Sequence, residues 1–291
     1  MLTTQSPKGT FDMSSLMQSN LFQRVAVALA GIPLLLWLNM EGGLYFLVLV
    51  LVLSLTATFE FQRLAAHRAH PPSILLLLPL TAFIQLNFYF RFLDYWEAVL
   101  AVVMFLYVLE LWRQQGSQFL NIGTTLVGLM YVNLTFGALL RLRLVGAAQG
   151  SSGPEAGASP VLLMFFCVWA ADIFAYFGGS TFGGKFITRK LFPRLSPKKT
   201  WEGYFCGIAG SVLAAWACSS FVTGYPTVRG AMIGLLIGVV SPAGDLMESM
   251  FKRDAGVKDS SGIIPGHGGV LDRFDTIMFI APLIYFLVTR G

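Results

Sequence analysis

Long apolar runs separated by short polar connections extend along the whole chain. Nine such runs occupy residues 25–38, 43–62, 73–91, 95–113, 120–141, 160–178, 203–223, 228–247 and 274–289. A helix that crosses a bilayer needs about 20 mostly apolar residues, and backbone that faces lipid must be helical unless it closes a barrel. The runs lack the alternation of barrel strands. The pattern therefore predicts an all-α, polytopic integral membrane protein with about nine transmembrane helices.

Composition supports the membrane interpretation. Of the 291 residues, 55% are hydrophobic and 12% are charged, and the mean hydropathy is +0.68, whereas a soluble domain has about 25% charged residues. The net charge of +5 fits attraction to anionic lipid. We expect no nucleic-acid partner, because no basic helix with interleaved aromatics lies outside the runs. Cys167, Cys206 and Cys218 lack pairing or metal spacing and are interpreted as small buried hydrophobes.

The chain divides into a polar tail at residues 1–20, N-terminal transmembrane helices at 21–142, and a C-terminal transmembrane catalytic region at 160–291. Loops at 179–202 and 248–273 belong to the last region, and residues 151–158 (SSGPEAGA) form a candidate flexible external loop. The first run is long for a signal peptide and lacks a cleavage site, so we expect a first transmembrane helix.

Lys and Arg predict the orientation. With nine spans, 15 of the 20 Lys and Arg residues lie on the side shared by the N-terminus and the two long C-terminal loops. Cytoplasmic loops carry such an excess. We therefore expect the active site at the cytoplasmic ends of the C-terminal helices, in a bacterial-type inner (plasma) membrane.

The first half of the chain offers little chemistry. Glu60, Glu110 and Arg141 lie near the ends of runs, where interfacial placement or snorkelling accounts for them. His67 and His70 lack an accompanying carboxylate or cysteine pattern and are not expected to bind metal.

The most polar stretch extends from Ser249 to Asp275, between two apolar runs. It combines cations, carboxylates, one histidine and several glycines: Lys252, Arg253, Lys258, Arg273, Asp254, Asp259, Asp272, Asp275, His267, Gly262, Gly266, Gly268 and Gly269. Cations suit phosphates, carboxylates suit a hard metal, and glycines allow close backbone approach. The stretch predicts a metal-dependent site for a phosphorylated substrate.

Spacing supports a divalent metal site. Asp245, Glu248 and Ser249 share one helix face, and Asp272 and Asp275 are three residues apart. Mg²⁺ prefers oxygen ligands and is usually shared with substrate phosphates. The structural alternative is a salt-bridge network of Asp272 and Asp275 with Arg273 and Lys252.

Asp172 lies inside an otherwise apolar run. A charge there costs at least ~2.5 kcal/mol on the insertion scale, so it is a functional candidate by default. The structural alternative is a pair with a lysine.

The polar stretch also resembles a family signature. Ser249, Lys252-Arg253, Lys258-Asp259, Pro265, His267-Gly268-Gly269 and Asp272-Arg273-Phe274-Asp275 fill every fixed position of the signature of the phosphatidate cytidylyltransferases, or CDP-diacylglycerol synthases. Residues 196–203 (SPKKTWEG), and Asp172 with Ala175 and Tyr176, resemble further segments of that family. The resemblance covers about residues 165–280.

This resemblance implies Mg²⁺-dependent transfer of a cytidylyl group from CTP to phosphatidate, giving CDP-diacylglycerol and pyrophosphate. The residues that it implies for handling the phosphates are Lys252, Arg253, Lys258, His267 and Arg273. The further substrate-binding candidates are Lys198, Lys199, Ser249, Gly266, Gly268 and Gly269. The metal candidates are Asp245, Asp272 and Asp275, followed by Asp172 and Glu248.

Some features of the implied enzyme stay open in the sequence. Whether a monovalent cation such as K⁺ joins Mg²⁺ is one of them. The resemblance implies a homodimer, for which the small residues Gly207, Gly210, Gly230, Gly234 and Gly238 are weak interface hints.

Two alternative functions remain. A CTP-dependent polyprenol or phytol kinase would transfer the γ-phosphoryl group and release CDP, and the full signature disfavours it. An ion-coupled membrane transporter could relay ions through Asp172 and Asp245. The clustering of polar residues in one half of the chain disfavours the transporter, since transporters often have paired interrupted helices in two halves.

Overall fold

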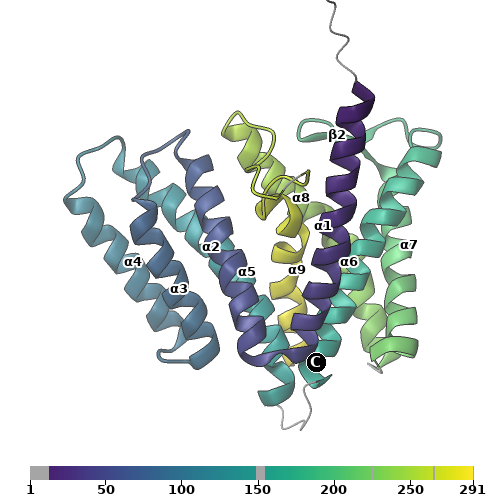
Figure 1. Cartoon of the computed structure of the whole chain (residues 1–291), viewed down its shortest axis with the longest axis horizontal. Helices are drawn as coiled ribbons and strands as arrows, with labels where there is room; N and C mark the ends of the chain where they lie inside the picture. Colours follow the sequence, from purple (N-terminus) through teal and green to yellow (C-terminus); the bar gives the residue numbers. More distant parts are fainter. Residues whose placement is uncertain (1–12, 149–154, 224–225, 265, 291) are drawn as a thin grey trace, which may run out of the picture.

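A computed structural model describes residues 13–148, 155–223, 226–264 and 266–290, and these residues form nine α-helices (Figure 1). The helices are α1 (Met13–Glu41), α2 (Gly43–Ala65), α3 (Ile74–Phe90), α4 (Tyr95–Leu111), α5 (Gln118–Ala148), α6 (Glu155–Phe182), α7 (Trp201–Cys218), α8 (Thr227–Asp254) and α9 (Leu271–Arg290). A π-helical turn, Ser219–Thr223, extends α7. Each predicted apolar run coincides with one of these helices to within two residues at either end, once the π-helical turn is counted with α7, or lies inside a longer helix.

Six segments in the described part of the chain are long and apolar enough to cross a membrane. They lie in α1, α2, α5, α6, α7 with its π-helical turn, and α8. Helices α3 and α4 have 17 residues each, and α9 carries Asp272, Arg273 and Asp275 at its start. The fold is thus that of a mostly helical multi-pass membrane protein, and crossing by all nine helices stays a prediction.

The helix ends differ from several of the divisions expected from the sequence. The polar tail was expected to end at residue 20, but α1 already begins at Met13, and the rest of the tail lies outside the described residues. Half of the loop expected at 151–158 lies outside the described residues, and the other half belongs to α6, which begins at Glu155. Helix α6 continues to Phe182 and α8 to Asp254. The two C-terminal loops are therefore shorter than 179–202 and 248–273.

The first of these loops contains a small antiparallel hairpin. Strand β1 (Lys190–Phe192) pairs with β2 (Ser196–Thr200). Strand β2 leads directly into α7, whose first turn is capped by the Thr200 hydroxyl accepting the Gly203 N–H at 3.2 Å. The hairpin, the α8–α9 connection and the N-terminal end of α1 lie at the same end of the bundle (Figure 1).

Small residues join α6, α7 and α8 closely. A Cβ added at Gly207 would lie 3.1 Å from the Ala171 carbonyl oxygen on α6, and one added at Gly234 would lie 2.9 Å from that of Ser211 on α7. Gly210, Gly230 and Gly238 likewise face neighbouring helices of the same chain. These five glycines pack the bundle internally, so their interpretation as interface hints is withdrawn.

Three charged residues of the first half that were expected at the interface are instead buried inside the protein. Glu60, Glu110 and Arg141 are 0%, 5% and 8% exposed. Glu110 accepts hydrogen bonds from Arg113 at 2.8 Å and from Asn121 at 2.7 Å. Such partners offset the cost of burying a carboxylate. The cysteine prediction is confirmed for Cys167 and Cys218, which are buried, while Cys206 is half-buried; all three are free.

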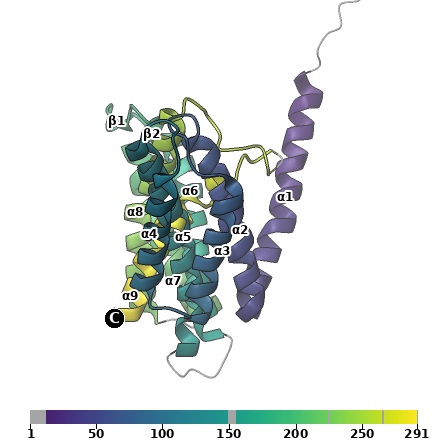
Figure 2. The ribbon, with the colours of Figure 1, turned by 90° about the vertical axis from the view of Figure 1, so that its left-hand side faces the viewer.

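Helix α1 stands apart from the rest of the bundle (Figure 2). Only 6% of its most apolar window is buried inside the protein. Its C-terminal end is held by Arg143, which donates to the Asn39 carbonyl at 2.6 Å, and a second contact lies near its midpoint, where Arg24 donates to the Gly266 carbonyl at 2.9 Å. Between these two contacts α1 mostly faces its surroundings.

Candidate active site

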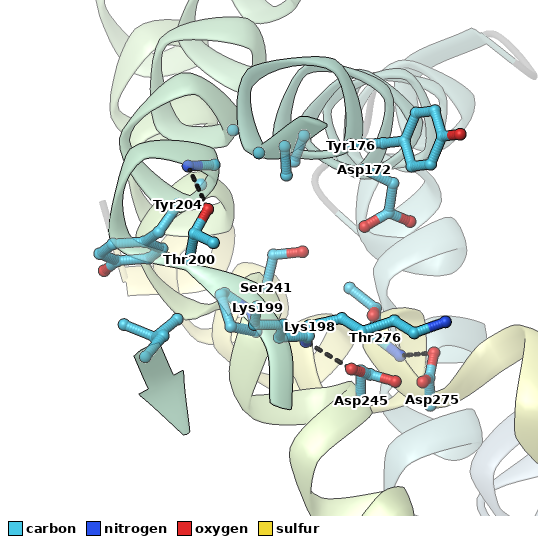
Figure 3. Close-up of a pocket in the computed structure, with 18 of the residues that line it drawn as sticks. Asp172, Tyr176, Lys198, Lys199, Thr200, Tyr204, Ser241, Asp245, Asp275 and Thr276 are labelled. Atoms are coloured by element: carbon cyan, nitrogen blue, oxygen red, sulfur yellow. Dashed lines mark hydrogen bonds and ion pairs between the residues drawn. The ribbon is translucent and has the colours of Figure 1, made fainter. Parts of the chain in front are cut away.

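A cavity of about 580 Å³ lies between α6, α7, α8, α9 and the hairpin. Figure 3 shows side chains from four elements meeting there: Asp172 from α6, Lys198 and Lys199 from β2, Asp245 from α8 and Asp275 from α9. All five had been predicted as site residues. The fold thus brings together residues separated by up to about a hundred positions in the sequence.

Three carboxylates form the centre of the site. Asp245, Glu248 and Asp275 each offer an oxygen within 4.8 Å of the others. Asp245 and Glu248 are three residues apart on α8, as the sequence predicted. Asp275 comes from α9, which approaches α8 so closely that a Cβ on Gly244 would lie 2.6 Å from the Thr276 Cα. This close approach sets the third carboxylate beside the first two.

The three carboxylates fit a divalent cation. Glu248 is 2% exposed, and its Oε1 atom is buried without a hydrogen-bond partner. A buried carboxylate oxygen without a partner is costly, and a hard cation would satisfy it with the all-oxygen donor set that Mg²⁺ prefers. Asp275 keeps one bond of its own, from the Thr276 N–H to Oδ1 at 2.5 Å.

Two lysines line the cavity beside these acids. Lys199 forms an ion pair with Asp245, and Lys198 also lines the cavity and is exposed (Figure 3). Asp172 points into the same space and lines the cavity with Asp275. Asp172 is thus an exposed acid on the cavity wall, and its functional role stays a prediction.

Asp272 and Lys252 are engaged with each other. Lys252 Nζ lies 2.6 Å from Asp272 Oδ1 and 2.6 Å from Glu248 Oε2. The other oxygen of Asp272 accepts the N–H groups of Ser260 at 2.9 Å and Gly269 at 2.8 Å. Asp272 thus forms the salt bridge that the structural alternative predicted. The Lys252 ammonium group is paired with two carboxylates, those of Glu248 and Asp272.

The ionisation of Asp272 reflects these bonds. Burial favours the neutral acid and would raise the pKa of Asp272. Its bonds with Glu248, Lys252 and the loop N–H groups outweigh burial and hold the pKa below its ordinary value. Asp272 is therefore an anion at neutral pH, and its charge orders the loop before α9.

The remaining predicted side chains divide into one that lines the cavity and four that do not. Arg273 lines the cavity, and its Nε donates to the His267 carbonyl oxygen at 2.6 Å. Arg253 and Lys258 are exposed, and Ser249 is half-buried. Among the described residues, the cavity lining does not include these three, nor His267. Their roles toward substrate stay predictions.

The signature glycines have structural work of their own. Gly268 has a φ of +85° and accepts the Ile264 N–H at 2.8 Å. The Gly269 N–H, predicted for phosphate, donates to Asp272 instead. The Gly266 carbonyl accepts from Arg24. The Gly268 carbonyl and the Gly269 N–H thus hold the loop and the start of α9, and the Gly266 carbonyl joins the loop to α1.

Sequence reasoning missed two buried carboxylates that hold the loops. Glu202 Oε1 accepts the N–H groups of Gly184 at 3.1 Å, Phe186 at 3.1 Å and Ile187 at 2.8 Å. Glu60, on α2, bonds the α8–α9 connection. The rule applied to Asp172, that an acid in an apolar run is functional by default, would have singled out Glu60 as well.

Comparison with known proteins identifies the family of the chain. A model described as the Cytidylyltransferase family matches residues 22–290. A phosphatidate cytidylyltransferase of Synechocystis sp. is 38% identical over 296 residues, covering 91% of this chain and 96% of the relative. Those of Brucella abortus and Bacillus subtilis are 32% and 29% identical, and they cover 92% and 91% of this chain and 93% and 97% of their own. The chain therefore belongs to the cytidylyltransferase family.

Proposed function

We propose that the protein is a phosphatidate cytidylyltransferase that converts CTP and phosphatidate to CDP-diacylglycerol and pyrophosphate. The observation that carries the proposal is the cluster of Asp245, Glu248 and Asp275 beside the cations of one cavity. The family and its phosphatidate cytidylyltransferase members support the same reaction. We also propose that the site faces the cytoplasm of a bacterial inner membrane, that nine helices cross it, and that the protein is a homodimer.

The reaction needs placement of charge more than proton transfer. A phosphate oxygen of phosphatidate forms a bond to the α-phosphorus of CTP, and the bond from that phosphorus to the pyrophosphate oxygen breaks. The nucleophile is already an anion, so no strong base is required. Catalysis then rests on orientation and on charge neutralisation in a preorganised site.

Lys198 and Arg273 are the cations best placed for this work. Both line the cavity, and neither has a carboxylate partner among the ion pairs of the described residues. They would hold the phosphates of CTP and of the lipid head group. Lys199 would set the position of Asp245 through their ion pair. Arg273 is in turn oriented by the His267 carbonyl.

Asp245, Glu248 and Asp275 would hold Mg²⁺, with Asp172 as a further candidate. The bound ion would neutralise charge on the phosphates and on the pyrophosphate leaving group. The fit rests on the oxygen donor set and on the unpartnered Glu248 Oε1. We also propose that a monovalent cation such as K⁺ binds beside Mg²⁺, and no observation of the structure bears on this part of the proposal.

The test uses purified protein in detergent, phosphatidate and CTP labelled at its α-phosphate. We expect label in a lipid product and released pyrophosphate with Mg²⁺, and neither with a chelator. Release of CDP without labelled lipid would refute the proposal and favour the polyprenol or phytol kinase. A folded preparation without turnover on either substrate would also refute it and leave the transporter.

A further inference from the structure

Glu60 is a fully buried acid in the half of the chain that the proposed reaction does not use. It lies on α2 and is 0% exposed. Its four recorded partners are about 200 residues away in the sequence, in the connection between α8 and α9. An acid buried at this cost needs a compensating set of donors. Here the donors lie in the signature segment, the stretch from Ser249 to Asp275 that resembles the family signature.

The four donors are two backbone N–H groups and two hydroxyls. Val270 N–H donates to Oε1 at 2.9 Å and Leu271 N–H to Oε2 at 2.8 Å. The Ser261 hydroxyl donates to Oε1 at 2.6 Å, and that of Ser260 lies 3.2 Å from Oε2. Helix α9 begins at Leu271, so Glu60 caps this helix from another part of the chain. A negative charge there also complements the positive end of the helix dipole.

The glycine of the signature fits against the same carboxylate. A Cβ at Gly269 would lie 2.0 Å from the Ser260 hydroxyl oxygen and 2.5 Å from Glu60 Oε1. The second glycine of His267-Gly268-Gly269 is therefore required by the approach of Glu60. Ser260 also joins the two acids, because its hydroxyl is 2.8 Å from Asp272 Oδ2 and can serve either.

The carboxylate cluster depends on where α9 begins. Asp275 lies one helical turn after Leu271, so a shift of the first turn of α9 moves Asp275 relative to Asp245 and Glu248. On this basis we infer that Glu60 is a positioning residue for the proposed reaction: it fixes the start of α9 and thereby the third carboxylate of the cation site. This inference rests on the proposed function for its consequence in turnover.

The test compares Glu60→Gln with the wild-type protein. In glutamine an NH₂ group replaces one of the two accepting oxygens. This NH₂ group then faces the N–H of Val270 or Leu271, and that buried N–H loses its hydrogen-bond acceptor. We expect hydrogen exchange in a peptide that contains Val270 and Leu271 to rise at least tenfold. Removal of partners behind a metal ligand typically costs about 10–100-fold in affinity or activity. We therefore expect the Kd for Mn²⁺, measured by electron paramagnetic resonance without substrate, to rise about tenfold and kcat to fall similarly.

Glu110→Gln is the matched control, because it also removes a buried acid from a helix of the N-terminal half. It should leave exchange at Val270 and Leu271 and the Mn²⁺ affinity unchanged, even if it lowers the Tm. If the Glu60→Gln protein is folded and has only a lower Tm, as the control does, while its hydrogen exchange and its Mn²⁺ Kd are unchanged, the inference is overturned.

Ser261→Ala decides the matter if Glu60→Gln does not fold. It removes one donor to Glu60 and should raise both exchange and the Mn²⁺ Kd by a smaller factor, about threefold, and no change in either would overturn the inference. If the wild-type protein makes no CDP-diacylglycerol while exchange responds to Glu60→Gln, the proposed reaction fails and the anchoring by Glu60 stands.

Discussion

The contact of Gly244 with α9 gives the sharpest prediction. A methyl group at this position in Gly244→Ala would lie 2.6 Å from the Thr276 Cα and 2.7 Å from the Asp275 carbonyl oxygen. Ordinary contact begins at 3.4 Å, and both neighbours are backbone atoms that cannot rotate away. The start of α9 must therefore retreat from α8 by about 0.8 Å, and it takes Asp275 with it.

The size of the effect follows from this displacement. A misplacement of about 1 Å in a catalytic site costs about 100-fold in rate, whereas overpacking costs about 1–3 kcal/mol in stability. We expect kcat for CDP-diacylglycerol formation to fall about 100-fold in Gly244→Ala, and half-maximal activity to need more Mg²⁺. The assay is transfer of the α-labelled cytidylyl group to phosphatidate, with the Tm in detergent measured in parallel.

Gly123→Ala is the matched control for this experiment. Gly123 lies in α5, and an added Cβ meets nothing within 4 Å, so alanine should keep full activity and stabilise the helix by up to about 1 kcal/mol. If Gly244→Ala is folded and turns over like the wild type, the separation of α8 and α9 does not set the carboxylate site.

Three further predictions concern the charges of the site. Asp245→Asn and Asp275→Asn should each lower turnover at least about 100-fold with folding retained, because each removes one charged oxygen ligand; normal turnover in either variant would contradict the proposed cation site. Lys252→Met should lower the free energy of unfolding by about 3–5 kcal/mol, because it leaves Glu248 and Asp272 buried without their shared cation; denaturant titration in detergent measures this loss, and an unchanged midpoint would contradict it. A chelator should abolish turnover and added Mg²⁺ should restore it, while loss that Mg²⁺ cannot reverse would speak against a bound ion as the cause.

The extent of the fold that the sequence could predict has a physical basis. Apolar runs of about 20 residues are typical of membrane helices by composition alone, which explains why each of the nine predicted runs corresponds to an α-helix of the described residues, while six segments are long and apolar enough to cross a membrane. Their ends were less accurate, because helices α6 and α8 continue past the apolar region through Phe182 and Asp254. Polar residues can extend a helix beyond the lipid without any change in pattern.

The site was predictable where its chemistry is local. Asp245 and Glu248 share a helix face by spacing, and Asp172 is an acid in an apolar run. Glu60 was interpreted as interfacial because its partners are about 200 residues away. The sequence left Lys252 open between phosphate binding and a salt bridge with Asp272, because its position between Glu248 and Asp272 depends on where α9 returns to α8. Long-range pairing of this kind has no signature in a single sequence.

The isolation of α1 has a mechanical consequence. Arg143 joins its C-terminal end to the bundle, and Arg24 makes a second contact near its midpoint. A helix with little lateral support adjusts its tilt to the thickness of the surrounding hydrocarbon. Because Arg24 donates to Gly266 in the signature segment, a change of tilt pulls directly on the loop that precedes α9. A single hydrogen bond thus links the helix that lies apart from the bundle to the segment that precedes α9, so the position of this helix in the bilayer and the position of that segment are coupled.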